Sequence, residues 1–141
     1  MKVLFLDIDG VLNCQTTPGS MYRKLDKFMV ARLDRVLDAT NAKVVLSSTW
    51  RLAGVESVQQ ILRDHGMRNW ARVIDRTPRD LGDVIRGREI GEWLTKHPDV
   101  KTFAIVDDDR DMGSLLPFLV QTNWVVGMTD KDADKLIRML R

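Results

Sequence analysis

The chain has few of the features that mark a specialised class of protein. It contains a single cysteine, Cys14, in 141 residues, which excludes an internal disulfide and fits a reducing compartment. No apolar run approaches the roughly 18 residues that a membrane-spanning helix needs. The formal net charge of +2 is too small to indicate nucleic-acid binding by itself. We therefore expect a cytoplasmic protein without a membrane partner.

What remains is the composition of an ordinary globular protein. Hydrophobic residues make up 44% and charged residues 30% of the chain, as in typical compact domains. Internal repeats, low-complexity tracts and linker-like stretches are not apparent in the sequence. We expect one domain over residues 1–141.

Two carboxylates follow the first apolar run, at residues 3–6. Asp7 and Asp9 are two positions apart, so in an extended chain they project from the same face and can address one metal ion or one substrate atom. This pattern suits phosphoryl transfer, with Asp7 as the nucleophile and Asp9 as the acid that protonates the leaving oxygen. Mg²⁺ would bridge carboxylate and phosphate oxygens. A strand end followed by an acidic turn is the alternative.

Hydroxyl and basic side chains follow a second apolar run, at residues 43–46. Ser47, Ser48 and Arg51 are candidate phosphate ligands, because hydroxyls and N–H groups at a strand end are good donors to phosphate oxygens. For Ser48 and Thr49, capping of the next helix is an equally good explanation. Ser47, nearest the strand, is the better candidate.

A dense acidic cluster follows a third apolar run, at residues 102–106. Four of residues 107–111 are aspartates, and their mutual repulsion would be relieved by a bound cation. A calcium loop does not fit, because Met112 stands at the position of its glycine and Phe118 at the position of its glutamate. A solvated acidic turn is the alternative.

The apolar spacing predicts alternating strands and helices. Helices are expected around residues 25–37, 55–66, 90–94 and 133–140, and strands at 3–6, 43–47, 71–74, 102–106 and 118–121. This order predicts an α/β fold with a doubly wound, mainly parallel five-stranded sheet flanked by helices. The functional groups would then gather at the carboxyl edge of the sheet.

These motifs resemble those of the haloacid dehalogenase (HAD) superfamily of aspartate-nucleophile phosphatases. The resemblance is strongest to the small HAD domains of Swiss-army-knife RNA repair proteins. The four motifs of the superfamily are matched by residues 3–13, 44–51, 86–94 and 105–112. The resemblance implies a HAD-like Rossmannoid fold and a Mg²⁺-dependent phosphatase that works through an aspartyl-phosphate intermediate.

The resemblance also implies roles for individual residues. Asp7 is the nucleophile, Asp9 the general acid/base and Ser47 a phosphate ligand. The phosphate-side cation is Arg86 or Arg88, in place of the more common lysine, and a guanidinium is not equivalent to an ammonium group. The candidate metal ligands are Asp7, Asp9, Asp107, Asp108 and Asp111, the last two representing alternative versions of the fourth motif.

The spacing of the motifs bears on the substrate. Neither the segment between the first two motifs nor the one after Arg88 has room for a cap domain, which ordinarily needs upwards of about 50 residues. Capped relatives enclose small metabolites, so an open site suggests a phosphate on a nucleic-acid end or a nucleotide. Another phosphomonoester, including a phosphoprotein, and a non-catalytic phosphate-binding module are the alternatives. No obligate protein partner is predicted.

Overall fold

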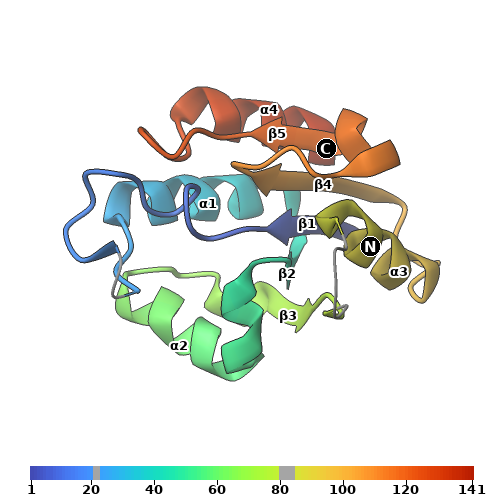
Figure 1. Cartoon of the computed structure of the whole chain (residues 1–141), viewed down its shortest axis with the longest axis horizontal. Coiled ribbons are helices and arrows are strands. Elements are labelled where there is room, and N and C mark those ends of the chain that lie inside the picture. Colours follow the sequence, from blue (N-terminus) through green and yellow to red (C-terminus); the bar gives the residue numbers. More distant parts are fainter. Residues whose placement is uncertain (21–22, 80–84) are drawn as a thin grey trace.

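The computed structural model of the chain describes residues 1–20, 23–79 and 85–141. Five strands form one sheet in the order β3-β2-β1-β4-β5, and all of the pairings between them are parallel (Figure 1). The strands are β1 (Lys2–Leu6), β2 (Lys43–Leu46), β3 (Val73–Arg76), β4 (Thr102–Asp107) and β5 (Leu119–Gln121). The predicted α/β fold with a parallel five-stranded sheet is confirmed.

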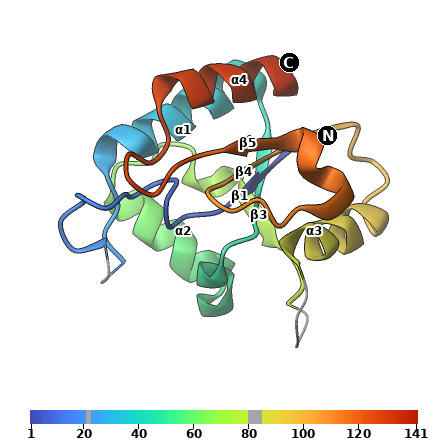
Figure 2. The same ribbon diagram turned by 45° about the horizontal axis from the view of Figure 1, so that its top comes forward.

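Helices cover both faces of this sheet. They are α1 (Lys27–Thr40), α2 (Val55–Asp64), α3 (Arg86–Thr95) and α4 (Asp130–Leu140), with short 3₁₀ segments η2 (Thr49–Ala53), η3 (Trp70–Arg72) and η4 (Gly113–Phe118). Apolar side chains of α1, α2 and α4 share one core with the sheet, whereas α3 packs in a second core. Figure 2 shows α3 across the sheet from α1 and α4. The sheet is therefore doubly wound.

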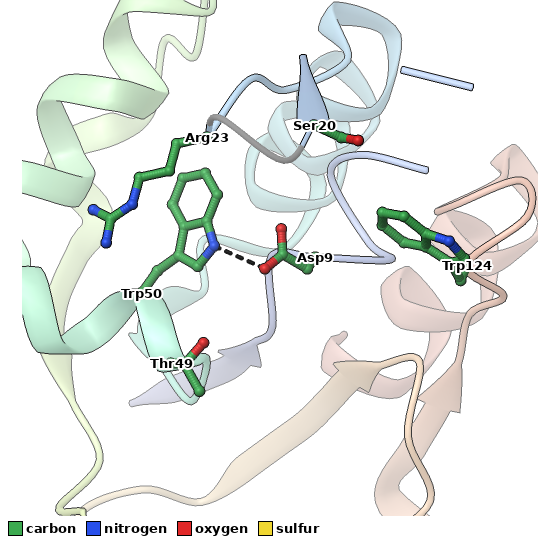
Figure 3. A pocket seen from close by; sticks show the side chains of 6 residues that line it. All are labelled: Asp9, Ser20, Arg23, Thr49, Trp50 and Trp124. Atoms are coloured by element: carbon green, nitrogen blue, oxygen red, sulfur yellow. Dashed lines mark hydrogen bonds between the residues drawn. The ribbon is translucent and has the colours of Figure 1, made fainter. Parts of the chain in front are cut away.

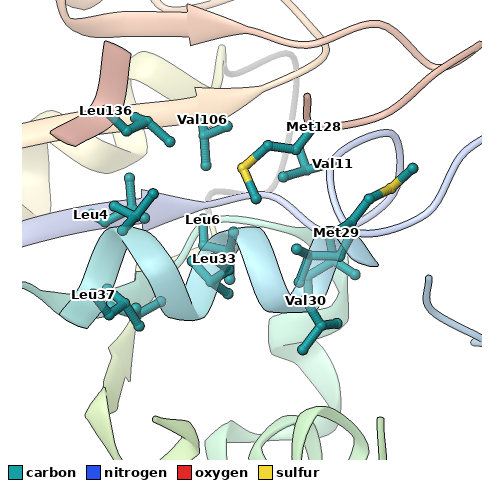
Figure 4. Close-up of a cluster of buried hydrophobic side chains, with 14 of the residues drawn as sticks. Leu4, Leu6, Val11, Met29, Val30, Leu33, Leu37, Val106, Met128 and Leu136 are labelled. Carbon is teal, nitrogen blue, oxygen red and sulfur yellow. The ribbon is translucent and has the colours of Figure 1, made fainter. Parts of the chain in front are cut away.

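The central strand β1 is apolar at every internal position because both of its faces are covered. Leu4 and Leu6 point into the larger core, where they meet side chains of α1 and α4 (Figure 4). Val3 and Phe5 point into the smaller core, and the ring of Phe5 meets the ring of Trp93 edge-on at 5.5 Å. This alternation fixes the register of β1 and hence the direction in which residues beyond Leu6 leave the sheet.

The boundary of β3 differs from the prediction of a strand at 71–74. The strand begins at Val73, because the residues before it form η3. The cause is a tether to α1: the carboxylate of Asp34, buried in α1, accepts hydrogen bonds from the backbone N–H groups of Arg68 and Asn69 at 2.9 and 3.0 Å. The chain must turn after this tether before it can join β2.

The described connections agree with the prediction of a site without a cap domain. In residues 1–20 and 23–79, β1 leads through a loop into α1, and in residues 85–141 only a short turn joins α3 to β4. Within the described residues, each helix is too short or too polar to cross a bilayer.

Candidate active site

Three aspartates meet where β1 and β4 end. Leu6 pairs with Val106 in the sheet, so the residues that follow them, Asp7 and Asp107, leave the same edge side by side. The backbone N–H of Asp7 donates to the carbonyl of Val106 at 3.1 Å, which continues the ladder into the site. One carboxylate oxygen from each of Asp7, Asp107 and Asp108 lies within 4.8 Å of the other two. The strand pairing thus brings Asp7 and Asp107 together, and Asp108 completes a triad of carboxylates, which we call the acidic triad.

The acidic triad is largely removed from water. Asp7 is 5% exposed and Asp107 is fully buried. The pKa of Asp7 is raised to about 9, chiefly by burial and next by the charge of Asp107, while the charge of Arg86 opposes both effects. Burial also raises the pKa of Asp107, although Arg86 counteracts it. Without a further cation, the surroundings of the acidic triad therefore favour the protonated form of Asp7.

The chemistry of the acidic triad fits a hard divalent cation. Its donors are all carboxylate oxygens, which Mg²⁺ prefers in proteins, and Mg²⁺ bonds of about 2.0–2.1 Å allow two ligands to be up to about 4.2 Å apart. The spacing of the three oxygens is within 4.8 Å, so a small inward movement would suffice to place them around one ion. A cation there would also counteract the raised pKa values, because its charge favours the ionised carboxylates.

Arg86 is the basic residue in contact with the acidic triad. It is the first residue of α3, and its Nη1 lies 2.5 Å from Oδ2 of Asp107 and 3.4 Å from Oδ1 of Asp7. Burial alone would lower the pKa of Arg86, but the charges of Asp107 and Asp7 outweigh that effect and raise it. Arg88 is exposed and lines a separate hollow between α3 and η4. Of the two arginines considered from the sequence, the structure places Arg86 in the site.

The position of Arg86 depends on a close approach between α3 and the segment after β4. The backbone N–H groups of Arg86 and Gly87 donate to the side chain and the carbonyl of Asp111, at 3.2 and 3.0 Å. A Cβ atom on Gly87 would overlap the carbonyl of Met112, so only glycine fits there. Asp111 therefore anchors the start of α3, and it lies outside the acidic triad.

Asp9 also lies outside the acidic triad. Both of its carboxylate oxygens are engaged: Oδ2 accepts from the indole N–H of Trp50 at 2.9 Å, and Oδ1 accepts from the Asn13 amide at 3.0 Å. Of the five candidate metal ligands, the structure brings together Asp7, Asp107 and Asp108. The hydrogen bonds from Trp50 and Asn13 hold the carboxylate of Asp9 in one orientation.

The serines after β2 have different surroundings. Ser47 is fully buried and its hydroxyl oxygen has no hydrogen-bond partner among the described residues. Its backbone N–H donates to the carbonyl of Leu6 at 3.0 Å, which places it next to the end of β1. Ser48 instead caps η2, where its hydroxyl accepts from the N–H of Trp50 at 3.1 Å. Ser47 thus has a free hydroxyl for a ligand, whereas that of Ser48 already has a structural role.

Arg51, which the sequence suggested as a phosphate ligand, is hydrogen-bonded to other parts of the protein. Its guanidinium is buried, and Nη1 donates to the carbonyls of Ser47 and Ser48 at 2.9 and 2.8 Å. Nη2 donates to both carboxylate oxygens of Glu89, on α3, at 3.0 Å. Through these bonds Arg51 ties the loop that carries Ser47 to the helix that carries Arg86, and its role as a phosphate ligand stays a prediction.

Further residues support the site, and the role of Thr122 among them was not identified from the sequence. Thr122, just after β5, donates through its hydroxyl to the carbonyl of Gly10 at 2.7 Å and through its backbone N–H to the carbonyl of Asp107 at 2.9 Å. Asn13 accepts from the N–H of Gly10 at 2.9 Å. Gly10 itself has a φ of +81°, and a Cβ atom there would overlap the carboxylate of Asp108. The one sequence signal for Thr122 was its position just after a predicted strand, at the edge where the functional groups gather.

Comparison with known families agrees with this geometry. The family model of the HAD domain in Swiss Army Knife RNA repair proteins matches residues 3–133. The chain belongs to this HAD family. Among curated proteins, none matches the sequence. Membership confirms the resemblance identified from the four motifs, and it supports phosphatase chemistry of the HAD type in general for a domain whose acidic triad can bind a metal.

Proposed function

We propose that this HAD domain is a Mg²⁺-dependent phosphomonoester hydrolase that forms an aspartyl-phosphate on Asp7. Its substrate would be a phosphate on a nucleic-acid end or a nucleotide, and its location the cytoplasm. The observation that carries the proposal is the meeting of Asp7, Asp107 and Asp108 beside Arg86 at the carboxyl edge of the sheet. A buried set of carboxylates beside the guanidinium of Arg86 suits an anionic substrate only if a cation is added.

The acidic triad would hold Mg²⁺, which when bound supplies positive charge that offsets the repulsion between Asp7 and a phosphate. A carboxylate oxygen of Asp7 attacks phosphorus, the bond from phosphorus to the leaving oxygen breaks, and that oxygen takes a proton from Asp9. In the second step a water molecule gives a proton to Asp9 and attacks phosphorus, which releases phosphate and restores the Asp7 carboxylate.

Two further side chains are suited to bind the phosphoryl oxygens. A guanidinium has five N–H donors, so Arg86 has donors beyond those that its Nη1 directs at Asp107 and Asp7. The hydroxyl of Ser47 is buried and unpartnered among the described residues, and a phosphate oxygen would satisfy it. Arg51 and Glu89 act as positioning residues, because they link the segment of Ser47 to α3.

Two observations support a nucleic-acid end or nucleotide as substrate. The described connections after β1 and α3 contain no inserted domain that would enclose the site, so a large substrate has access. The family to which the chain belongs is named for RNA repair proteins. A phosphatase with the same mechanism acting on a phosphoprotein is the second candidate, and open access to the site favours it equally.

A panel of phosphomonoesters tests the proposal. The panel contains 3′- and 5′-phosphorylated oligonucleotides, mononucleotides, a ribose phosphate and a phosphopeptide, each with Mg²⁺ and with excess EDTA. We expect phosphate release only with Mg²⁺, and the highest kcat/KM on an oligonucleotide or a nucleotide. The absence of Mg²⁺-dependent release from every substrate would contradict the proposal, and a clear preference for the phosphopeptide would select the second candidate.

The raised pKa values of the acidic triad predict a pH-dependent response to Mg²⁺. Because burial and the neighbouring carboxylates raise the pKa of Asp7 from 3.8 to about 9, the metal-free folded protein binds more protons than the unfolded chain between about pH 4 and 9. Its stability therefore falls as pH rises through that window. Mg²⁺ competes with these protons, so we expect it to raise Tm more at pH 8.5 than at pH 5.5.

Thermal unfolding with Mg²⁺ and with EDTA at the two pH values measures this response. The Asp7→Asn variant is the control, and its metal-free Tm should depend less on pH over the same window. An equal effect of Mg²⁺ on the wild-type Tm at both pH values would show that the acidic triad does not bind the ion.

A further inference from the structure

A pocket opens directly beside Asp9. It has a volume of about 410 Å³, within the range of small-ligand sites. We call it the indole pocket, and its lining residues are Asp9, Ser20, Arg23, Thr49, Trp50 and Trp124 (Figure 3). These residues come from the segment after β1, the start of η2 and the loop after β5. The mechanism proposed above uses only one of them, Asp9.

Two indole rings flank Asp9 in this pocket. Trp50 is 5% exposed and donates its N–H to Asp9, and Trp124 lies on the other side of Asp9 (Figure 3). Trp124 is 40% exposed, so much of its aromatic surface is open to a ligand. Its backbone is nonetheless fixed, because its carbonyl accepts from the N–H of Gln15 at 2.8 Å and a bridge between Asn123 and Gly127 closes the loop around it. The backbone that carries the Trp124 ring is therefore held in place beside the pocket.

The remaining groups of the indole pocket are polar or cationic. Arg23 is exposed, and its guanidinium carbon lies 5.4 Å from the ring centroid of Trp50. The hydroxyls of Ser20 and Thr49 add donors and acceptors. An aromatic surface, hydroxyls and a cation together match a ligand with an aromatic ring, a sugar and a negative charge.

The location of the pocket specifies which part of the substrate would enter it. Asp9 protonates the leaving oxygen in the proposed mechanism, so the leaving group must lie next to Asp9. The indole pocket occupies that place. For a phosphorylated nucleic-acid end or nucleotide, the leaving group is the nucleoside.

We propose that the indole pocket binds the nucleoside that bears the scissile phosphate, with its base stacked on Trp124. Arg23 would bind the next phosphate when the nucleoside belongs to a polynucleotide. This proposal rests on the proposed function and specifies its substrate: recognition depends on the base, without reading its hydrogen-bonding edge. A mononucleotide and a polynucleotide end share this chemistry, and Arg23 distinguishes between them.

Substrates that differ only in the base test the stacking. We would compare kcat/KM for a nucleoside monophosphate and for the corresponding ribose phosphate in the wild type and in Trp124→Ala. Loss of base stacking on an aromatic ring reduces affinity by roughly 5- to 150-fold. We expect the preference of the wild type for the nucleotide to fall by such a factor in Trp124→Ala, mainly through KM, and to be retained in Trp124→Phe.

Val126→Ala is the matched control, because Val126 is in the same loop, is 53% exposed and does not line the indole pocket. It should leave the preference unchanged. Arg23→Gln should weaken activity on an oligonucleotide more than on the mononucleotide if the substrate is a polynucleotide end. Equal losses on both would assign the site to mononucleotides.

Failure of this inference can be distinguished from failure of the proposed function. If the wild type hydrolyses nucleotide and ribose phosphate equally well, or if Trp124→Ala keeps the wild-type preference, the inference is overturned and the phosphatase stands. If the wild type hydrolyses none of the substrates, a direct measurement of nucleotide binding tests the inference. Calorimetric titration of the nucleoside monophosphate into wild type and Trp124→Ala would then show a 5- to 150-fold loss of affinity, or overturn the inference by showing none.

Discussion

An Asp7→Asn variant is expected to lose kcat/KM on every substrate by about 10⁴-fold or more, the scale seen when an enzyme loses its nucleophile. The amide has nearly the same shape as the carboxylate, but it cannot form the aspartyl-phosphate. Phosphate release with Mg²⁺ measures the loss. Acid quenching during turnover of a radiolabelled substrate should leave label on the wild type and none on the variant.

The same substitution separates loss of chemistry from loss of fold. Asp7 is 5% exposed and its charge is unfavourable without a cation, so the metal-free variant should unfold at or above the wild-type Tm at pH 8. Asp109→Asn is the matched control: Asp109 belongs to the same acidic run but is exposed and outside the acidic triad. It should retain activity to within about twofold. Activity of Asp7→Asn close to that of the wild type would exclude the aspartyl-phosphate mechanism.

The fold was largely predictable because both faces of the sheet are covered. In that situation a strand appears in the sequence as a short continuous apolar run, as at residues 3–6 and 102–106, and polar residues at its end mark the functional edge. The start of β3 was not predictable in this way. It depends on the tether between Asp34 and the backbone of residues 68–69, a contact across more than 30 positions that leaves no local pattern.

The site was predictable to the extent that strand ends determine it. Asp7 and Asp107 follow paired residues of adjacent strands, so the topology alone brings them together. The choice between Arg86 and Arg88 could not be made from the sequence, because it depends on where α3 begins. Asp111 and Gly87 determine that point through a backbone contact. The orientation of the Arg51 side chain could not be predicted from the sequence either, because its partner Glu89 is on a different helix.

The ion pair between Arg51 and Glu89 connects the two halves of the site through the protein interior. The side chains of Arg51 and Glu89 are only 5% and 8% exposed. Burial lowers the pKa of Arg51, and the charge of Glu89 opposes that effect. Because Arg51 also holds the carbonyls of Ser47 and Ser48, we expect a change at Glu89 to affect the loop that carries Ser47.

A Glu89→Ala variant is therefore expected to lose about 3–5 kcal/mol of unfolding free energy, the cost of leaving a buried charge without its partner. Tm should fall by roughly 10 °C or more, given the usual relation for a domain of this size. Glu89→Gln should lose less, because an amide oxygen can still accept from Arg51. Chemical denaturation of both variants measures the difference.

An exposed ion pair provides the control for this prediction. Arg35 and Asp134 join α1 to α4 at 2.9 Å with side chains 44% and 52% exposed, and Asp134→Asn should cost no more than about 1 kcal/mol. A double variant that replaces both Arg51 and Glu89 with methionine should be more stable than the sum of the single losses predicts, since neither charge is left unpaired. Additive losses would mean that the two side chains act independently, and the proposed link between Ser47 and α3 would be wrong.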